Sequence, residues 1–486
     1  MRVVIVNPAA RSQVYGPLSS LAAIEIPVWA GIIADYLILR GVEVEILDCE
    51  ADGLDAETAA KKIRDARPDL AVFTVYGQQP SASTQCLPAA EDIARRCGVR
   101  TMCVGTHPSA LPHKTLSEGP WTYVAEGEGH RTVIGLLHAL DGMWQIKDVP
   151  GLWWRNGDHI VSNLKAKFAV NLDSELGSRG LKRFDFKKYR AHNWHAFGFP
   201  SASPYASLQT SLGCPFRCTF CCINAPFQGS SIRHWSPDNV LGAMDYLAKQ
   251  GVKHIKIPDE MFLLNPEYYE SICDGILERG YDFNIWAYAR VDTVKERHLE
   301  KLKRAGFNWL AIGIESASKN VRDGSVKGRF SDEDIYKTVR GIQKAGIAVG
   351  ANYIFGLPDD THESMQHTLD MALELNTEWA NFYSAMAYPG SALHGIARKN
   401  GWALPEDGPG WIGYAQHSYE CLPLPTQTLS AREVLAFRDA AHKAYFDRTE
   451  YLKLIGGKFG ALAVADVLRM NRHTLKRALL TEKEEA

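Results

Sequence analysis

The chain has 486 residues, of which 46% are hydrophobic and 23% are charged, a balance typical of a folded protein with two or three domains. Its formal net charge of -2 argues against a general nucleic-acid or anionic-membrane binder, and no apolar run reaches the length of a membrane span. Residues 1–7 pass straight into a strand pattern without the features of a signal peptide, so we expect a cytoplasmic protein.

Residues 1–140 alternate apolar strand patterns with helical patterns. The predicted strands are Val3–Val6, Val44–Leu47, Leu70–Val75, Thr101–Val104 and Tyr123–Ala125. The predicted helices cover Val28–Leu39, Ala56–Arg67, Ser83–Arg96 and a stretch through Leu137. Short apolar strands separated by helices predict a parallel sheet covered on both faces, in a flavodoxin-like Rossmann domain.

Sheets of this kind bind ligands at the carboxyl ends of their strands. The residues near those ends are therefore the candidate ligand contacts of this domain: Asn7, Tyr76, Gln78, Gly105, Thr106, His107, Glu126, Gly127 and Glu128. No Gly-x-Gly-x-x-Gly motif follows the first strand, which disfavours a dinucleotide as the ligand.

Residues 141–204 are predicted to form a connector that contains one hairpin. Residues 151–155 and 159–161 have strand character and flank Asn156-Gly157, a strong signal for a tight turn. The stretch that follows is basic, aromatic and irregular.

Residues 205–395 again alternate strands and helices. The predicted strands are Ser207–Leu212, His254–Ile257, Phe283–Ala289, Leu310–Ile314, Ala348–Phe355 and Ala380–Ala385. Six strand–helix repeats predict a partial (β/α)6 TIM barrel whose chemistry lies at the carboxyl ends of the strands. Residues 396–486 are predicted to be mainly helical.

Four of the ten cysteines lie between Cys214 and Cys222, directly after the first predicted barrel strand. Thiolates suit iron–sulfur clusters, and Cys214, Cys218 and Cys221 can each bind a different iron of a 4Fe–4S cluster. The fourth iron then stays open for a small chelating ligand. A structural zinc site is the alternative, but it needs a fourth ligand, and Cys222 is poorly placed beside Cys221.

The Cys-x3-Cys-x2-Cys loop resembles the signature of the radical S-adenosylmethionine (SAM) superfamily, with Phe220 as the aromatic residue before the last ligand. Further segments at the predicted strand ends resemble the motifs of that superfamily in order: Ile257–Phe262, Ala289–Asp292, Gly313–Ser316, Phe355–Pro358 and Tyr388–Ser391. Each motif is weak alone, and together they cover the whole middle region.

The resemblance implies that SAM chelates the open iron and is cleaved by one electron to methionine and a 5′-deoxyadenosyl radical. It assigns Asp259 or Glu260 to the SAM amino group, and Arg290 or Lys327 to the SAM carboxylate. Glu315 would accept a hydrogen bond from a ribose hydroxyl, and Gly356 would lie near the adenine. Taken alone, charged residues of this kind are more often parts of solvated or structural ion pairs.

A flavodoxin-like domain before such a barrel resembles the cobalamin-binding class of the superfamily. The local matches are Gly105–Pro108 and Glu126–Glu128. The chain lacks the Asp-x-His-x-x-Gly motif of domains that place a histidine on cobalt, so the resemblance implies cobalamin without a histidine ligand. Tyr76 or Gln78 would then lie nearest the lower face of the corrin.

Two alternatives remain for this domain. It holds another ligand, or it only supports the barrel, since a fold does not imply a function. The methylthiotransferases, whose N-terminal domain carries a second cluster, are disfavoured because the cysteines of this region do not sit together at successive strand ends: Cys49, Cys86, Cys97 and Cys103.

The resemblance implies C-methylation of an unactivated carbon of a small molecule, in which the substrate radical takes a methyl group from methylcobalamin. Cyclisation or rearrangement without net methyl transfer is the alternative, and a non-catalytic sensing module is a third. A flavodoxin- or ferredoxin-type protein would supply the electron. Tyr383, Tyr388 and Trp286 are candidate pocket residues, and the basic segment 469–477 is most simply a solvated helix face.

Overall fold

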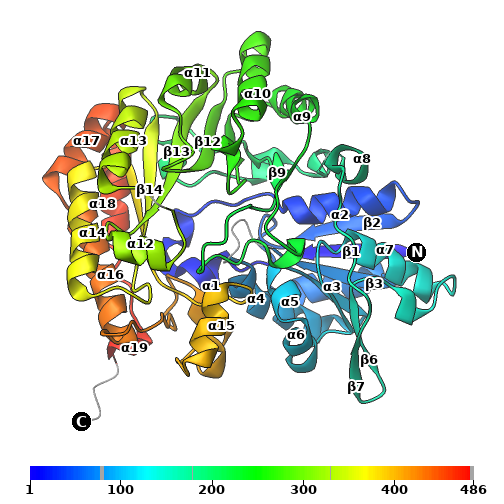
Figure 1. Cartoon of the computed structure of the whole chain (residues 1–486). Coiled ribbons are helices and arrows are strands. Elements are labelled where there is room, and N and C mark those ends of the chain that lie inside the picture. Colours follow the sequence, from blue (N-terminus) through cyan, green and yellow to red (C-terminus); the bar gives the residue numbers. More distant parts are fainter. Residues whose placement is uncertain (77–81, 178, 329, 482–486) are drawn as a thin grey trace.

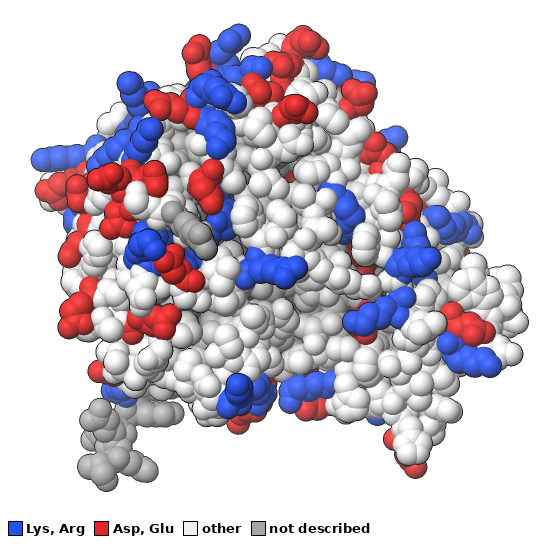
Figure 2. All heavy atoms as spheres, in the orientation of Figure 1, with Lys and Arg blue, Asp and Glu red and all other residues white. Residues whose placement is uncertain are grey.

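The computed structural model describes residues 1–76, 82–177, 179–328 and 330–481, and Gln78 lies outside these ranges. Two sheets organise the described chain, and the C-terminal helices pack beside the second of them (Figure 1). Among the described helices, none combines the length and apolar character that a bilayer crossing requires. Figure 2 shows acidic and basic side chains interspersed over one face of the molecule.

The N-terminal sheet has the strand order β2-β1-β3-β4-β5-β6-β7. Its strands are β1 (Arg2–Asn7), β2 (Glu43–Asp48), β3 (Leu70–Val75), β4 (Thr101–Gly105), β5 (Tyr123–Ala125), β6 (Leu152–Asn156) and β7 (His159–Ser162). The first five are parallel in the order 2-1-3-4-5, so the predicted flavodoxin-like fold is confirmed. Its helices are α1 (Arg11–Tyr15), α2 (Val28–Ile38), α3 (Ala56–Ala66), α4 (Ala82–Cys97), α5 (Thr106–Ala110), α6 (Pro112–Glu118) and α7 (His130–Leu140).

The hairpin that the sequence assigns to a connector forms as β6 and β7. It does not stand apart from the first domain, because β6 pairs antiparallel with β5 and extends the sheet. Trp153 pairs with Val124 and Trp154 with Tyr123. The N-terminal sheet thus continues to Ser162. The domain boundaries at residues 140, 204 and 395 stay predictions. The helix α8 (Leu172–Leu176) follows in the irregular segment that leads to the barrel.

The second sheet is a partial barrel of six parallel strands in the order β15-β14-β13-β12-β11-β8, as predicted. Its strands are β8 (Tyr205–Ser207), β11 (His254–Ile257), β12 (Asn284–Arg290), β13 (Phe307–Glu315), β14 (Ala348–Phe355) and β15 (Trp379–Ser384). The connecting helices are α9 (Pro237–Lys249), α10 (Pro266–Arg279), α11 (Leu299–Arg304), α12 (Lys319–Gly324), α13 (Asp332–Lys344), α14 (His362–Leu375) and α15 (Ala392–Lys399).

The predicted strand Ser207–Leu212 is wrong in its extent. The chain leaves the barrel sheet soon after β8, and β9 (Ser211–Leu212) pairs instead with β10 (Arg233–His234). The cause is Asp259, which accepts hydrogen bonds from the Thr210 amide at 2.8 Å and from the Thr210 and Ser211 hydroxyls at 2.6 Å each. These bonds turn the chain toward the cysteine loop.

The C-terminal region is helical, as predicted. Its helices are α16 (Ala431–Phe446), α17 (Thr449–Phe459), α18 (Ala461–Asn471) and α19 (Ala478–Thr481). Helix α16 begins with a capping box in which Ser430 and Glu433 bond each other's backbone amides. It packs on the barrel through Arg438, whose Nε donates to the Phe382 carbonyl of β15 at 2.7 Å.

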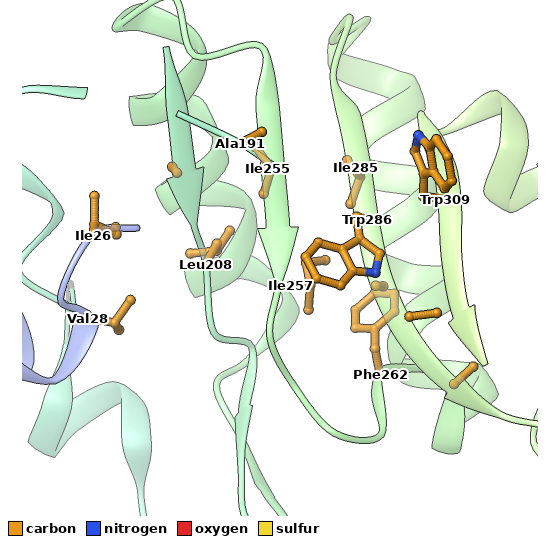
Figure 3. Close-up of a cluster of buried hydrophobic side chains, with 14 of the residues drawn as sticks. Ile26, Val28, Ala191, Leu208, Ile255, Ile257, Phe262, Ile285, Trp286 and Trp309 are labelled. Carbon is orange, nitrogen blue, oxygen red and sulfur yellow. The ribbon is translucent and has the colours of Figure 1, made fainter. Parts of the chain in front are cut away.

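One continuous apolar core joins the three regions. Figure 3 shows Ile26 and Val28 of the N-terminal region beside Leu208, with Ile255 and Ile257 of β11 next to it. Burial of apolar side chains across this junction holds the two sheets in one body. The junction places the carboxyl ends of both sheets toward a common space.

Candidate functional site

A cavity of about 410 Å³ lies at the carboxyl ends of the barrel strands, a size typical of small-molecule sites. We call it the barrel cavity. Its lining includes the three predicted cluster ligands and four charged residues of the predicted SAM site: Cys214, Cys218, Cys221, Glu260, Arg290, Glu315 and Lys327. Phe220 lines the same cavity beside the cysteines. Trp286, Tyr383 and Tyr388, which the sequence suggests as pocket residues, also line it.

A second cavity lies at the carboxyl ends of the N-terminal sheet, and we call it the N-terminal cavity. Asn7, Tyr76 and Thr106 line it, as predicted for a ligand site of this fold. The two cavities share several lining residues: Val14, Tyr15, Glu25, Ala82, Gln85, His192 and Glu260. They are therefore adjoining parts of one space between the two sheets.

The cysteine loop is held in a tight conformation. Gly213 precedes it with φ +86°, and a Cβ at this position would lie 2.3 Å from the Ser231 carbonyl oxygen. The Cys214 amide donates to Asn224 Oδ1 at 3.1 Å, and Asn224 Nδ2 donates to the Cys214 carbonyl at 2.9 Å. No sequence signal singles out Asn224, since its role depends on the shape of the loop.

Burial raises the pKa of Cys214 to about 11 and that of Cys221 well above its usual value. Binding of iron would displace these protons, as thiolate ligation requires. Among the described residues, no three His, Cys, Asp or Glu side chains converge on one ion position. A cubane cluster does not need such convergence, because each thiolate binds a different iron. Three cysteines on one cavity wall fit a cluster of this kind.

The two neighbouring acids Asp259 and Glu260 have different roles. Asp259 is 3% exposed, and its oxygens accept the three hydrogen bonds that turn the chain after β8. Glu260 lines both cavities, and no described residue donates a hydrogen bond to its carboxylate. Burial raises its pKa to about 7, against the lowering effect of Lys256 and Lys327. Glu260 is therefore the acid that can meet the amino group of a ligand.

Lys327 and Glu315 form a buried pair at 2.6 Å, and Glu315 has φ +67°, a strained conformation for a residue with a side chain. Arg290 is already engaged, since it pairs with Asp292 at 2.9 Å and its guanidinium lies 3.9 Å from the Phe216 ring centroid. Its Nη1 lies 3.7 Å from Cys218 Sγ. Both basic residues therefore already have an acidic partner, and the assignment of Arg290 or Lys327 to the SAM carboxylate stays a prediction.

Gly356 lies outside the lining of the barrel cavity. It has φ +82°, and a Cβ there would lie 2.4 Å from Val434 Cγ1 of α16. The glycine makes room for the C-terminal helix. Gly105 similarly permits close backbone packing, because a Cβ there would lie 1.9 Å from the Val75 carbonyl oxygen.

Tyr76 stacks on Trp29 with ring centroids 4.1 Å apart, and its hydroxyl donates to the Gly127 carbonyl at 3.0 Å. His107 is fully buried behind the cavity wall, where Nδ1 lies 3.1 Å from the Thr84 hydroxyl. Burial lowers the pKa of His107 to about 3, so the ring is neutral. His107 is absent from the described lining of both cavities, and its predicted contact with cobalamin stays a prediction.

Glu126, Gly127 and Glu128 lie beside the N-terminal cavity and are absent from its described lining. Glu126 accepts from Trp153 Nε1 at 2.9 Å. Glu128 is 3% exposed and pairs with Arg233 of β10 at 2.7 Å. These contacts tie the first domain to its hairpin and to the barrel.

Several residues that line the cavities were not predicted from the sequence. Glu25 of the N-terminal region pairs with the fully buried Lys256 of β11 at 3.1 Å. Tyr15 of α1 stacks on His417, with ring centroids 5.4 Å apart. Both contacts join segments that are distant in the sequence, so no local motif marks them.

Two family models match the regions just described. The model of the radical SAM superfamily matches residues 208–372, which include the cysteine loop and most of the barrel. The model of the B12 binding domain matches residues 17–137, which cover most of the flavodoxin-like part. The chain belongs to the cobalamin-dependent radical SAM enzymes.

This enzyme is 28% identical over 369 residues to an uncharacterised methyltransferase of Pyrococcus horikoshii, covering 74% of this chain and 76% of that one. It is 26% identical over 404 residues to an anaerobic magnesium-protoporphyrin IX monomethyl ester cyclase of Cereibacter sphaeroides, covering 81% of this chain and 63% of the cyclase. The radical SAM methyltransferase TsrM from Kitasatospora setae, solved with cobalamin and a 4Fe–4S cluster bound, has the same fold, with a TM-score of 0.68. That match has 18% identity and covers 97% of this chain and 99% of TsrM.

The cofactors of this radical SAM enzyme are a 4Fe–4S cluster, SAM and cobalamin. The three cysteines and the charged residues that line the barrel cavity fit the cluster and SAM. The N-terminal cavity, at the strand ends of a B12 binding domain, fits the third. The assignment of individual residues to each cofactor stays a prediction.

The assignment of Glu260 to the SAM amino group can be tested through the pH dependence of SAM binding. If its carboxylate binds the SAM amino group, SAM affinity should rise by about tenfold between about pH 6 and pH 8, because ionisation near pH 7 creates the acceptor. Calorimetric titration of the cluster-loaded enzyme measures this rise. E260Q should lower the affinity and flatten the profile. An unchanged profile in E260Q would remove Glu260 from the SAM site.

Proposed function

We propose that this enzyme is a C-methyltransferase that acts on an unactivated carbon of a small molecule. The observation that carries the proposal is the junction of the two cavities, whose walls share Glu25 and Glu260. When bound, the cluster and SAM supply a 5′-deoxyadenosyl radical, and cobalamin supplies a transferable methyl group. An unactivated carbon is no nucleophile, so its methylation needs both supplies within reach of one substrate.

The residues of the chain bind, orient and exclude water. Cys214, Cys218 and Cys221 would hold the cluster, while Glu260 and Lys327 would meet the amino and carboxylate groups of SAM. Glu315 would accept from a ribose hydroxyl while it orients Lys327. Tyr15 and His417, whose stacked rings line the barrel cavity, would help to keep water from the reacting carbon.

A second candidate function keeps the same cofactors without net methyl transfer. The similarity to the cyclase of Cereibacter sphaeroides favours it, since that alignment covers 81% of this chain. In this case the substrate radical would cyclise or rearrange. The alignment with the methyltransferase of Pyrococcus horikoshii covers 76% of that protein, against 63% of the cyclase, and supports the first candidate.

The products of SAM distinguish the two candidates. Anaerobic enzyme loaded with cluster and cobalamin is incubated with methyl-labelled SAM, a strong reductant and a low-molecular-mass cell extract. Methylation should give S-adenosylhomocysteine and 5′-deoxyadenosine in equal amounts, with the label in a new product. Product formation without S-adenosylhomocysteine or label would identify the cyclase alternative. Absence of 5′-deoxyadenosine would contradict both.

Two parts of the proposal concern the surroundings of the enzyme. We propose a flavodoxin- or ferredoxin-type protein as the electron donor, because cleavage of SAM needs one electron at low potential. We also propose a cytoplasmic location. Reduction of the cluster-loaded enzyme by a purified flavodoxin, followed by 5′-deoxyadenosine formation, tests the first part.

A further inference from the structure

One end of the barrel cavity is built by the C-terminal region rather than by cofactor motifs. Arg438 and His442 lie four residues apart on α16, which places them on the same face of the helix. His417 and Gln416, from the loop before α16, complete this end. We call these four residues the C-terminal wall. Gln416 is fixed by hydrogen bonds to both the amide and the carbonyl of Ser384.

The C-terminal wall and the residues that contact it carry an excess of positive charge. Arg438 is 3% exposed and pairs with Asp439 at 2.7 Å. Arg477 is 1% exposed and pairs with the same carboxylate at 2.9 Å. Two buried guanidinium groups therefore share one carboxylate. A buried charge without full compensation is costly, so a further anion at this place would stabilise the structure.

The other groups near Arg438 do not supply that anion. Burial lowers the pKa of His442 to about 3 and that of His417 well below its usual value, so both rings are neutral. Elsewhere in the lining of the barrel cavity, Lys327 is balanced by Glu315, and Lys256 is paired with Glu25.

Arg438 also has unused donors. Its Nε donates to the Phe382 carbonyl and its Nη1 to Asp439. Among the described residues, the contact of its Nη2 is His417 Nε2 at 3.5 Å, the outer limit for a hydrogen bond. A guanidinium presents five N–H donors, so Arg438 can still offer a ligand two of them in the geometry that suits a carboxylate or a phosphate.

We propose that the substrate is anionic and that Arg438 binds its negatively charged oxygen group. Carboxylate and phosphate or phosphonate share this chemistry. The inference rests on the proposed function in one respect, namely that the occupant of the cavity is the substrate. Its orientation follows: the anion lies at the C-terminal wall, and the remainder of the molecule points toward the cysteines.

Simple anions test this without knowledge of the substrate. Methylphosphonate, acetate and propylammonium are titrated by calorimetry into the full chain loaded with cluster, cobalamin and SAM. One or both anions should bind and the cation should not. The tighter of the two anions identifies the oxygen group. Binding of neither anion, or equal binding of propylammonium, would overturn the proposal.

Variants locate the site. R438Q should weaken anion binding by about tenfold or more, the usual effect of losing a charge-assisted hydrogen bond. H442E keeps every contact of Arg438 and places a carboxylate beside it, so it should abolish binding. If R438Q does not fold, H442E alone still tests whether the anions bind at Arg438. A444E adds the same charge to an exposed position of α16, and R448Q removes an arginine outside the cavity, so both should bind as the parent does.

The two proposals fail separately. If H442E binds the anions as tightly as A444E does, the anion site is elsewhere and the inference falls, whatever the products of SAM are. If the anions bind at Arg438 and the labelled-SAM experiment yields no S-adenosylhomocysteine, the substrate class stands and methyl transfer falls.

Discussion

Replacement of Cys214, Cys218 or Cys221 by alanine, one at a time, should leave an enzyme without a stable 4Fe–4S cluster and with no measurable 5′-deoxyadenosine formation. Each thiolate would hold its own iron, so the loss of one opens a second iron and exposes the cluster to loss or oxidation. Iron and sulfide analysis of anaerobically purified protein, with the visible spectrum, measures the cluster. Product analysis after addition of SAM and dithionite measures its activity.

Cys222 provides a matched control. It lies next to Cys221 in sequence, is 3% exposed and lines the same cavity. C222A removes an equivalent thiol and should retain both the cluster and 5′-deoxyadenosine formation. Loss of the cluster in C222A, with its retention in any of the other three variants, would contradict the assignment of the ligands.

Replacement of Glu128 by glutamine should destabilise the enzyme by about 3–5 kcal/mol, the usual cost of breaking a buried ion pair from one side. The change leaves Arg233, which is largely buried and contacts the rings of Phe168 and Phe227, without its carboxylate. Arg233 lies in β10, whose partner β9 leads into the cysteine loop. We therefore expect a lower denaturation midpoint together with weaker retention of cobalamin and of the cluster.

The neighbouring Glu126 supplies the comparison for this effect. It pairs at 2.7 Å with Lys165, which is 65% exposed, and exposed pairs contribute little. E126Q can still accept the hydrogen bond from Trp153 and should change the midpoint by less than about 1 kcal/mol. Similar midpoints for E126Q and E128Q would contradict the role given to the buried pair.

The sequence pattern predicts both sheets because local signals determine them. The apolar runs Val3–Val6 and Leu70–Val75 can be buried only inside a sheet with two covered faces, and both are strands of the N-terminal sheet. The strands from β11 to β15 agree with the predicted barrel in order and direction. Cys214, Cys218 and Cys221 all line the barrel cavity, as expected for ligands on one short loop.

The pattern does not reveal contacts that depend on partners distant in the sequence. The Asp259 carboxylate accepts hydrogen bonds from the Thr210 and Ser211 hydroxyls, and the position of Asp259 in a motif does not show this. His107 follows a strand end in the expected way but turns into the protein interior and contacts the Trp411 ring. The C-terminal wall carries no motif, because the role of Arg438 arises only when α16 packs against β15.

The stack of Tyr15 on His417 joins α1 of the N-terminal region to the segment that follows the barrel. During synthesis on the ribosome, the strands of both sheets are therefore made before His417 and the other residues of the C-terminal wall. Residues 416–442 thus join the lining of the barrel cavity after those strands, and we expect cofactors bound before this step to be retained more firmly than cofactors added to the finished chain.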